Sequence, residues 1–318
     1  MRILREVDSL CALLEQGEPL PYDPLRKSLY TVAELHENIE VATDSDGDPA
    51  EEPISRDLAI YNNFVARGRS DCDLVEALSQ RIHDWAIDEA LGNLIDEFAE
   101  QRIVGIMGGH GVGRDSDVYT AAAEVAWLVS RSGSVIASGG GPGIMEAANL
   151  GAWLGDQSND LLQQAFATLA AAPGYQDPGY SDAADQVLTM APNGTSSIAI
   201  PTWFYGHEPS NVFSANIAKY FSNSIREDRL LAICRGGIVF APGSAGTAQE
   251  VFQDAAQNHY ETFGPPSPMV FLGVEHWQQT GLWDAAITQA NGKPYRDLMT
   301  LVDTADEAAE FLSDLGHV

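Results

Sequence analysis

The stretch FAPGSAGTAQE (residues 240–250) joins an apolar run to a segment with the composition of a helix. Gly243 and Gly246 lie at this junction, and Glu250 follows four residues after the second glycine. Glycine lets the backbone adopt positive φ and approach a ligand closely. The free N–H groups at the start of the next helix favour an anion such as phosphate. The junction therefore predicts a strand, a glycine loop and a helix that together can bind phosphate.

The same order of apolar strand and helix recurs along residues 102–273. Strands are expected in RIVGIMGG (102–109), SVIASGGGPG (134–143), SSIAIP (196–201), GIVFAPG (237–243) and SPMVFLG (267–273). Helices are expected in VYTAAAEVAWLVSRSG (118–133), IMEAANLGAWL (144–154), NVFSANIAKYFSNSIREDRLLAICRG (211–236) and TAQEVFQDAAQNHY (247–260). Apolar strands that alternate with helices form a parallel sheet covered on both faces. The sequence thus predicts the α/β class, with a doubly wound, mostly parallel Rossmann-like sheet over residues 101–318.

Residues 1–100 are predicted to form a helical N-terminal extension. Apolar side chains recur at helical spacing from residue 74 onward, namely Leu74, Leu78, Ile82, Trp85, Leu91, Ile95 and Phe98. The acidic segment VATDSDGDPAEEPISRD (41–57) is interpreted as a solvated linker. It does not complete a calcium loop, because Pro49 and Ser55 stand where that loop needs glycine and glutamate. Residues 171–185 are interpreted as a surface insertion that can act as a lid.

The composition limits the partners of the protein. Seventeen Lys and Arg residues against 46 Asp and Glu residues give a formal net charge of −29. This charge repels phosphodiester backbones, so we expect no nucleic acid partner, although one local pocket can still bind a small anion. The three cysteines are widely spaced, which fits a reducing cytoplasm. We expect a cytoplasmic protein with no membrane partner, because no apolar run approaches a membrane span and the N-terminus is no signal peptide.

Three of the predicted strands end in glycine, at residues 108–111, 139–143 and 243–246. Ligands of open parallel sheets bind beyond the carboxyl ends of the strands, so the three loops favour a nucleotide-type ligand. The alternative is that the glycines only make tight turns. The dinucleotide motif and the P-loop motif are both absent. No metal-ligand spacing occurs among the histidines; His110 and His207 are either pocket residues or ordinary surface and core residues.

The predicted helix over residues 211–236 has two faces. Its apolar stripe, Phe213, Ile217, Phe221 and Ile225, is expected to pack on the sheet. Its polar stripe consists of Asn216, Lys219, Asn223 and Arg226. This stripe either faces water or lines the mouth of the pocket, and the pattern alone favours neither.

Taken together, these motifs resemble those of the LOG family of lysine-decarboxylase-like Rossmann proteins. PGSAGTAQE (242–250) resembles the family motif P-G-G-x-G-T-x-x-E, and SGGGPGIMEAAN (138–149) is similar to its second glycine motif. GIMGGHG (105–111) is similar to its first strand, and SIREDRLLAI (224–233) lies where the family has an arginine-bearing helix. The family includes cytokinin-activating phosphoribohydrolases and nucleotide 5'-monophosphate nucleosidases.

The resemblance implies hydrolysis of the N-glycosidic bond of a nucleoside 5'-monophosphate, AMP-like, to a free base and ribose 5-phosphate. It implies Arg226 and Glu250 as catalytic residues, no cofactor and no metal, and a homo-oligomer, a dimer or larger. The implied phosphate- and nucleotide-binding residues are Gly108, Gly109, Gly140, Gly141, Gly143, Met145, Asn223, Gly243, Ser244, Ala245, Gly246 and Thr247. The alternative is a non-catalytic nucleotide sensor or cofactor carrier on the same fold.

Three features leave alternatives open. Ser244 stands at the second glycine of the family motif, which would restrain the loop if that position needs positive φ. Arg229 competes with Arg226 for the catalytic position. Thr247-x-x-Glu250 also matches a capping box, in which threonine and glutamate satisfy the first N–H groups of a helix. Glu250 thus has a structural explanation beside the catalytic one.

Overall fold

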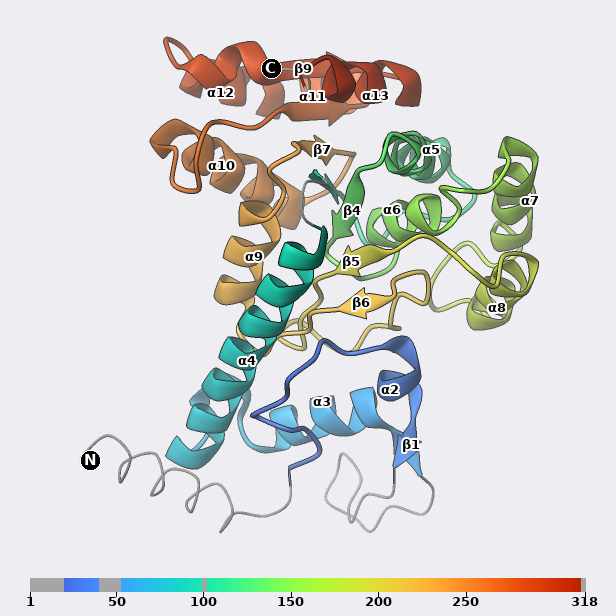
Figure 1. Cartoon of the computed structure of the whole chain (residues 1–318), viewed down its shortest axis with the longest axis vertical. Helices are drawn as coiled ribbons and strands as arrows, with labels where there is room; N and C mark the ends of the chain where they lie inside the picture. Colours follow the sequence, from blue (N-terminus) through green and yellow to red (C-terminus); the bar gives the residue numbers. More distant parts are fainter. Residues whose placement is uncertain (1–19, 40–52, 99–101, 316–318) are drawn as a thin grey trace. The chain divides into compact units, whose positions relative to one another are not determined.

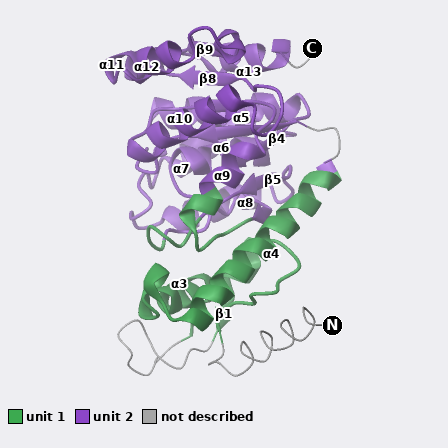
Figure 2. Ribbon diagram, turned by 90° about the vertical axis from the view of Figure 1, so that its left-hand side faces the viewer, with its two compact units in different colours: residues 1–97, 202–207, 218–226 green, residues 98–201, 208–217, 227–318 purple. Residues whose placement is uncertain are grey.

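The computed structural model describes residues 20–39, 53–98 and 102–315 (Figure 1). The chain forms two compact units (Figure 2). The first comprises residues 1–97, 202–207 and 218–226, and the second comprises residues 98–201, 208–217 and 227–318. The predicted N-terminal extension thus shares its unit with two later segments of the chain. Most of the acidic linker, including its calcium-like spacing, lies outside the described residues. Among the described helices, none is long and apolar enough to cross a membrane.

The second unit contains a seven-stranded sheet in the order β6-β5-β4-β3-β7-β8-β9. Every neighbouring pair in this sheet is parallel. The strands are β3 (Ile103–Met107), β4 (Val135–Ser138), β5 (Ser197–Ala199), β6 (Asn216–Ile217), β7 (Ile238–Phe240), β8 (Met269–Leu272) and β9 (Met299–Val302). The predicted fold class, a doubly wound parallel sheet, is therefore confirmed, and β6 and β9 were not predicted.

Helices of the second unit lie between these strands and after the last of them. They are α5 (Asp117–Arg131), α6 (Ile144–Trp153), α7 (Asn159–Leu169), α8 (Tyr180–Met190), α10 (Ala245–Tyr260), α11 (Val274–Gln279), α12 (Leu282–Gln289) and α13 (Ala305–Asp314), with the 3-10 turn η2 (Pro294–Leu298). Helix α5 begins where the Ser116 hydroxyl accepts the N–H of Tyr119. Small residues let α5 and α6 pack closely, since any side chain at Gly151 of α6 would collide with the Ala123 carbonyl of α5.

Residues 171–185 are only partly an insertion loop, because α8 begins at Tyr180. The loop before α8 is anchored at two points by Arg114. The backbone N–H of Arg114 donates to the Pro173 carbonyl (3.1 Å). Its guanidinium donates to the Tyr180 carbonyl (2.8 Å). These bonds attach the segment to the loop that follows β3.

The prediction of one long helix over residues 211–236 is wrong. The chain there forms β6 at Asn216–Ile217, and α9 spans only Asn223–Ala232. Asn216 joins the sheet edge, where its amide donates to the Ser197 carbonyl (3.3 Å). Lys219 lies before the helix and pairs with Asp57 (2.7 Å). The predicted polar and apolar stripes therefore do not form, because contacts with other parts of the chain override a helical pattern.

The first unit is built on α2 (Val32–His36), α3 (Arg56–Ala66), the 3-10 turn η1 (Arg69–Asp71) and α4 (Leu74–Phe98), whose last residue falls in the second unit. Strands β1 (Asn38–Ile39) and β2 (Ile54–Ser55) form an antiparallel pair. Asp57 lies in α3 and is buried, so the solvated-linker interpretation is wrong at its end.

Helix α4 buries only part of the predicted apolar stripe. Leu74 and Trp85 of the apolar stripe are 72% and 59% exposed. Leu91 of the stripe is buried as predicted, and the other buried positions are Glu76, Ser79, Gln80, His83, Asp84, Ala86, Ile87 and Ala90. The polar members of this face are hydrogen-bonded, which is the condition under which polar groups are buried without a large penalty.

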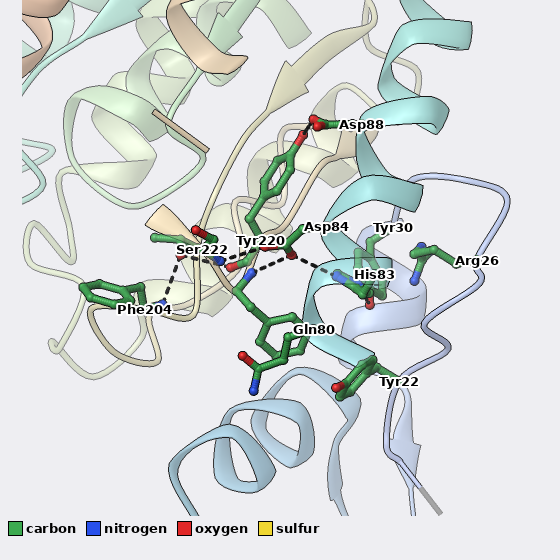
Figure 3. Close-up of polar contacts among 12 residues, drawn as sticks. Tyr22, Arg26, Tyr30, Gln80, His83, Asp84, Asp88, Phe204, Tyr220 and Ser222 are labelled. Carbon is green, nitrogen blue, oxygen red and sulfur yellow. Dashed lines mark hydrogen bonds and ion pairs between the residues drawn. The ribbon is translucent and has the colours of Figure 1, made fainter. Parts of the chain in front are cut away.

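His83 is buried against four aromatic rings, and each of its ring nitrogens has a hydrogen-bond partner (Figure 3). Its Nδ1 lies 3.2 Å from Asp84 Oδ1, and its Nε2 lies 2.8 Å from the Tyr30 hydroxyl. A carboxylate only accepts, so Nδ1 carries the proton and Nε2 accepts from Tyr30. Burial lowers the pKa of His83, and the hydrogen bond and charge of Asp84 offset only part of this effect.

The free energy of unfolding is expected to fall as the pH drops below the unfolded-state histidine pKa of about 6.5. Because the folded-state pKa of His83 is lower, the unfolded chain takes up the proton first. Above this pH the full contribution of His83 to the free energy of unfolding is present. As the pH falls from there to the folded-state pKa, this contribution is lost, with a slope of up to about 1.4 kcal/mol per pH unit.

Urea unfolding between pH 7.5 and 5 compares the natural protein with His83→Gln. The difference isolates His83, because buried Asp254, whose pKa burial raises to about 8, contributes the opposite slope in both proteins. Equal pH slopes for the two proteins would contradict the assignment.

Candidate functional site

The three predicted glycine loops lie at the carboxyl ends of three adjacent strands, β4, β3 and β7. From β3 the chain adds β4, β5 and β6 on one side, and then β7, β8 and β9 on the other. The direction of winding therefore reverses between β3 and β7. Open α/β sheets bind ligands at such a reversal point, outside the carboxyl ends of the strands.

The three loops contact one another. The Gly109 N–H donates to the Pro242 carbonyl (3.1 Å), and the Ile144 N–H donates to the Gly109 carbonyl (3.1 Å). Gly143 has φ +67°, and any side chain there would collide with the Gly109 and His110 carbonyls. A Cβ at Gly109 would lie 3.3 Å from the Cα of Gly243. The second and third loops thus both pack on the first.

The third loop leaves the amino end of α10 open. Helix α10 begins at Ala245, and its N-cap residue, Ser244, makes no side-chain cap. Ser244 has φ −115°, so serine fits the position where the family motif has glycine. Any side chain at Gly243 would collide with Thr247, whereas a Cβ at Gly246 would meet no atom within 4 Å. The first-turn N–H groups of this helix are therefore suited to an anion.

The second loop is shaped by its own glycines. Gly140 has φ +74°, and its N–H donates to the Ser138 hydroxyl (3.0 Å). A Cβ at Gly141 would lie 2.7 Å from Met145 Cε and 2.8 Å from Glu208 Oε2. In the first loop, a Cβ at Gly108 would lie 2.6 Å from the Ile144 side chain. Glu208 was not predicted as a site residue, since no motif surrounds it.

A buried ion pair joins the first loop to the helix after the second. Arg114 donates from Nε and Nη2 to the two carboxylate oxygens of Glu146 on α6, at 2.8 and 2.6 Å. The Tyr119 hydroxyl donates to the same carboxylate (2.9 Å), and the Arg114 guanidinium lies 3.3 Å from the centre of the Tyr180 ring. Neither residue of this pair was predicted as a site residue, although Glu146 lies within the second glycine motif (138–149).

Glu250 does not form the predicted capping box. With the N-cap at Ser244, Thr247 is the third residue of α10 and Glu250 is the sixth, which is beyond the open first turn. Glu250 is 8% exposed. Burial, followed by the charges of Asp254 and Glu250, raises the pKa of the Cys234 thiol. The structural explanation that the sequence offered for Glu250 is therefore wrong.

The remaining predicted site residues belong to the first unit. Asn223 and Arg226 lie in the first turn of α9, and the Asn223 amide donates to the Tyr205 hydroxyl (3.1 Å). Glu250 and all the glycine loops belong to the second unit. Of the two predicted histidines, His110 is exposed and His207 lies 3.2 Å from Asp57 Oδ2. The structure thus assembles the loops within one unit, and the predicted catalytic pair is divided between two.

No protein-family model matches the sequence, and no curated protein does. Among solved structures, a molybdenum cofactor binding protein from Rippkaea orientalis aligns at 13% identity with a TM-score of 0.42, covering 68% of this chain and 98% of that one. Two structures of the molybdenum cofactor carrier protein of Chlamydomonas reinhardtii align at 16% identity over 69% of this chain and 100% of theirs, with TM-scores of 0.41 and 0.43. Likenesses at this level carry no functional argument; the fold rests on the sheet itself.

Proposed function

We propose that this protein binds a phosphate-bearing nucleotide, of the nucleoside 5'-monophosphate type, at the glycine loops of the second unit. The observation that supports this is the contact between the three loops at the reversal point of the sheet, beside the open amino end of α10. Several backbone N–H groups and the helix dipole there favour a phosphate, and each such charge–helix contact contributes about 0.3–2 kcal/mol.

The proposed activity is hydrolysis of the N-glycosidic bond, with Glu250 as the carboxylate beside the sugar. Cleavage builds oxocarbenium character on the ribose, which a carboxylate stabilises while it positions water. Arg226 would bind phosphate or balance the charge of the departing base. What supports Glu250 is its burial on the helix that follows the third loop, now without a capping role.

The second candidate is a sensor or carrier that binds the ligand without cleaving it. The observation that favours it is that the loops needed for binding lie within one compact unit, whereas Arg226 and Glu250 belong to different ones. The predicted homo-oligomer also stays a prediction.

Incubation with a panel of nucleoside 5'-monophosphates, followed by assay of free base and ribose 5-phosphate, separates the two candidates. The 5'-phosphate is expected to be required, because the backbone N–H groups at the loops and at the amino end of α10 favour an anion over an uncharged base. AMP should therefore bind and turn over, and adenosine should do neither. Equal binding of AMP and adenosine would contradict the phosphate assignment, and binding without base release would favour the carrier.

Gly246→Ala is expected to raise the melting temperature and to weaken AMP binding. The free energy of unfolding should rise by up to about 1 kcal/mol, because alanine is the better helix former. No protein atom lies within 4 Å of the added methyl group. Only a ligand at the open end of the helix would therefore contact it.

Gly92→Ala is the matched control. Gly92 lies inside α4, and its added Cβ also meets nothing within 4 Å. It should raise stability without changing AMP affinity. AMP affinity is measured by calorimetry. If Gly246→Ala binds AMP as tightly as the natural protein does, the phosphate does not bind at the amino end of α10.

A further inference from the structure

Glu208 places a carboxylate against the second glycine loop. A Cβ added at Gly141 would lie 2.8 Å from Glu208 Oε2, so the carboxylate lies beside the backbone of that loop. Glu208 is half-buried, and among the residues that the structure describes its carboxylate has no hydrogen-bond or ion-pair partner. Its oxygens are therefore available to accept hydrogen bonds from a ligand at the loop.

The segment that carries Glu208 is tied to the second loop by buried amide and hydroxyl groups. The Asn211 amide donates to the Met145 carbonyl (3.1 Å) and to Asn149 Oδ1 (2.9 Å). The Ser138 hydroxyl donates to the same Asn149 oxygen (2.6 Å) and accepts an N–H group of the second loop (3.0 Å). All these residues belong to the second unit, so the position of Glu208 at the loop is set within that unit.

The amino ends of α6 and α10 differ in what they offer an anion. The Ile144 N–H of α6 already donates to the Gly109 carbonyl (3.1 Å), and the Glu208 carboxylate lies beside the loop before this helix. At α10, the N-cap Ser244 makes no side-chain cap, and a Cβ at Gly246 would meet no atom within 4 Å. Like charges repel, so the phosphate is expected at α10 and away from Glu208.

The rest of the nucleotide then extends from α10 towards the second loop. These two places follow β7 and β4, which have β3 between them. Neighbouring strands are spaced about 4.8 Å apart, so the two places are about 10 Å apart. A ribose 5-phosphate bridges this separation when a hydrogen bond is added at its hydroxyl end. Carboxylates bind ribose hydroxyls in this way in dinucleotide-binding folds.

We propose that Glu208 accepts hydrogen bonds from the ribose hydroxyls of the bound nucleotide and thereby selects ribonucleotides over deoxyribonucleotides. This inference rests on the proposed function, which brings a phosphate to the amino end of α10. It gives the ligand a direction, with the phosphate at α10 and the ribose at the second loop. It also assigns specificity to a residue outside the glycine motifs.

The test measures the dissociation constants of AMP and of 2',3'-dideoxy-AMP, which has the same phosphate and base but lacks both hydroxyls. The natural protein should bind AMP about tenfold or more tightly than the dideoxy ligand, the scale of a hydrogen bond to a charged group. Glu208→Ala should remove most of this preference by weakening AMP binding, and it should not weaken binding of the dideoxy ligand. Glu208→Gln should lie between the two, because an amide oxygen still accepts but carries no charge.

Glu307→Gln is the matched control. Glu307 is also a carboxylate at the amino end of a helix of the second unit, where it accepts from the N–H (3.1 Å) and the hydroxyl (2.8 Å) of Thr304. Glutamine can still complete this capping box. Glu307→Gln should therefore keep the ratio of the two dissociation constants that the natural protein has. Thermal melting checks that each variant is folded at the temperature of the titration.

The outcomes distinguish the role of Glu208 from the proposed function. A natural protein that binds neither ligand overturns the proposed function and this role with it. If the natural protein binds both ligands equally tightly, or if Glu208→Ala weakens both equally, the ribose contact is wrong and the phosphate site still stands. A preference that falls as far in Glu307→Gln as in Glu208→Gln shows a general effect of charge, and this result also overturns the inference.

Discussion

Glu250→Gln is expected to lower base release from the nucleotide about 10²–10⁴-fold, the usual scale for a positioned acid–base group, and to leave folding and AMP binding intact. Glutamine keeps the shape of the side chain and loses the charge that stabilises an oxocarbenium ion. Because Glu250 is the sixth residue of α10 and the N-cap is Ser244, the substitution removes no helix cap. A loss of turnover therefore reports on chemistry rather than on the start of the helix.

Asp254→Asn is the matched control for Glu250→Gln. Asp254 lies one helical turn further along α10, is 2% exposed, and has a pKa that burial raises to about 8, with Arg235 opposing this effect. It is thus largely a neutral acid at pH 7, which asparagine replaces without a change of charge. If Glu250→Gln releases base as fast as the natural protein does, the proposal of hydrolysis by Glu250 is wrong, and the sensor or carrier remains as the proposed function. Equal losses in both variants would show a general effect of polar changes on this helix.

The glycine loops were predictable because their causes are local. Apolar strands, the glycines after them and the following helices are encoded within about ten residues each, which is the range that periodicity and turn chemistry cover. The strands β3, β4, β5, β7 and β8 were expected where they occur. What local patterns could not supply is the contact between the loops, since Gly143 and Gly109 come from different strands.

The segment before α9 was not predictable for the opposite reason. Residues 211–236 carry helical periodicity, yet residues 219–222 are held by Asp57, Asp84 and Asp88, more than 130 residues earlier in the chain. A tertiary contact of this kind leaves no trace in the local pattern. The same applies to α4, where an apolar stripe of helical spacing stays partly exposed because the opposite face meets polar partners.

Four buried acidic residues have a structural use that the net charge of −29 conceals. Asp57, Asp84, Glu76 and Glu146 are each 3% exposed or less, and each accepts several hydrogen bonds. Asp57 and Asp84 hold the segments that return to the N-terminal extension, and Glu146 joins the loop after β3 to the start of α6. The net charge thus describes the surface and its expected repulsion of phosphodiester backbones, and it says nothing about the carboxylates that organise the interior.

Arg114→Met is expected to cost about 3–5 kcal/mol of unfolding free energy, because it leaves the Glu146 carboxylate buried without its ionic partner. The melting temperature should fall by roughly 10 °C. Arg114→Lys should cost less, since an ammonium keeps the charge but cannot make the two parallel hydrogen bonds of the guanidinium.

The double variant Arg114→Met/Glu146→Gln isolates the ion pair. Glutamine removes the stranded charge and still accepts from the Tyr119 hydroxyl, so the double variant should be more stable than Arg114→Met alone. The pair joins the loop after β3 to the start of α6, so the single variant should also weaken AMP binding, which calorimetry beside thermal melting would measure. A double variant whose loss equals the sum of the two single losses would show that Arg114 and Glu146 stabilise the protein independently.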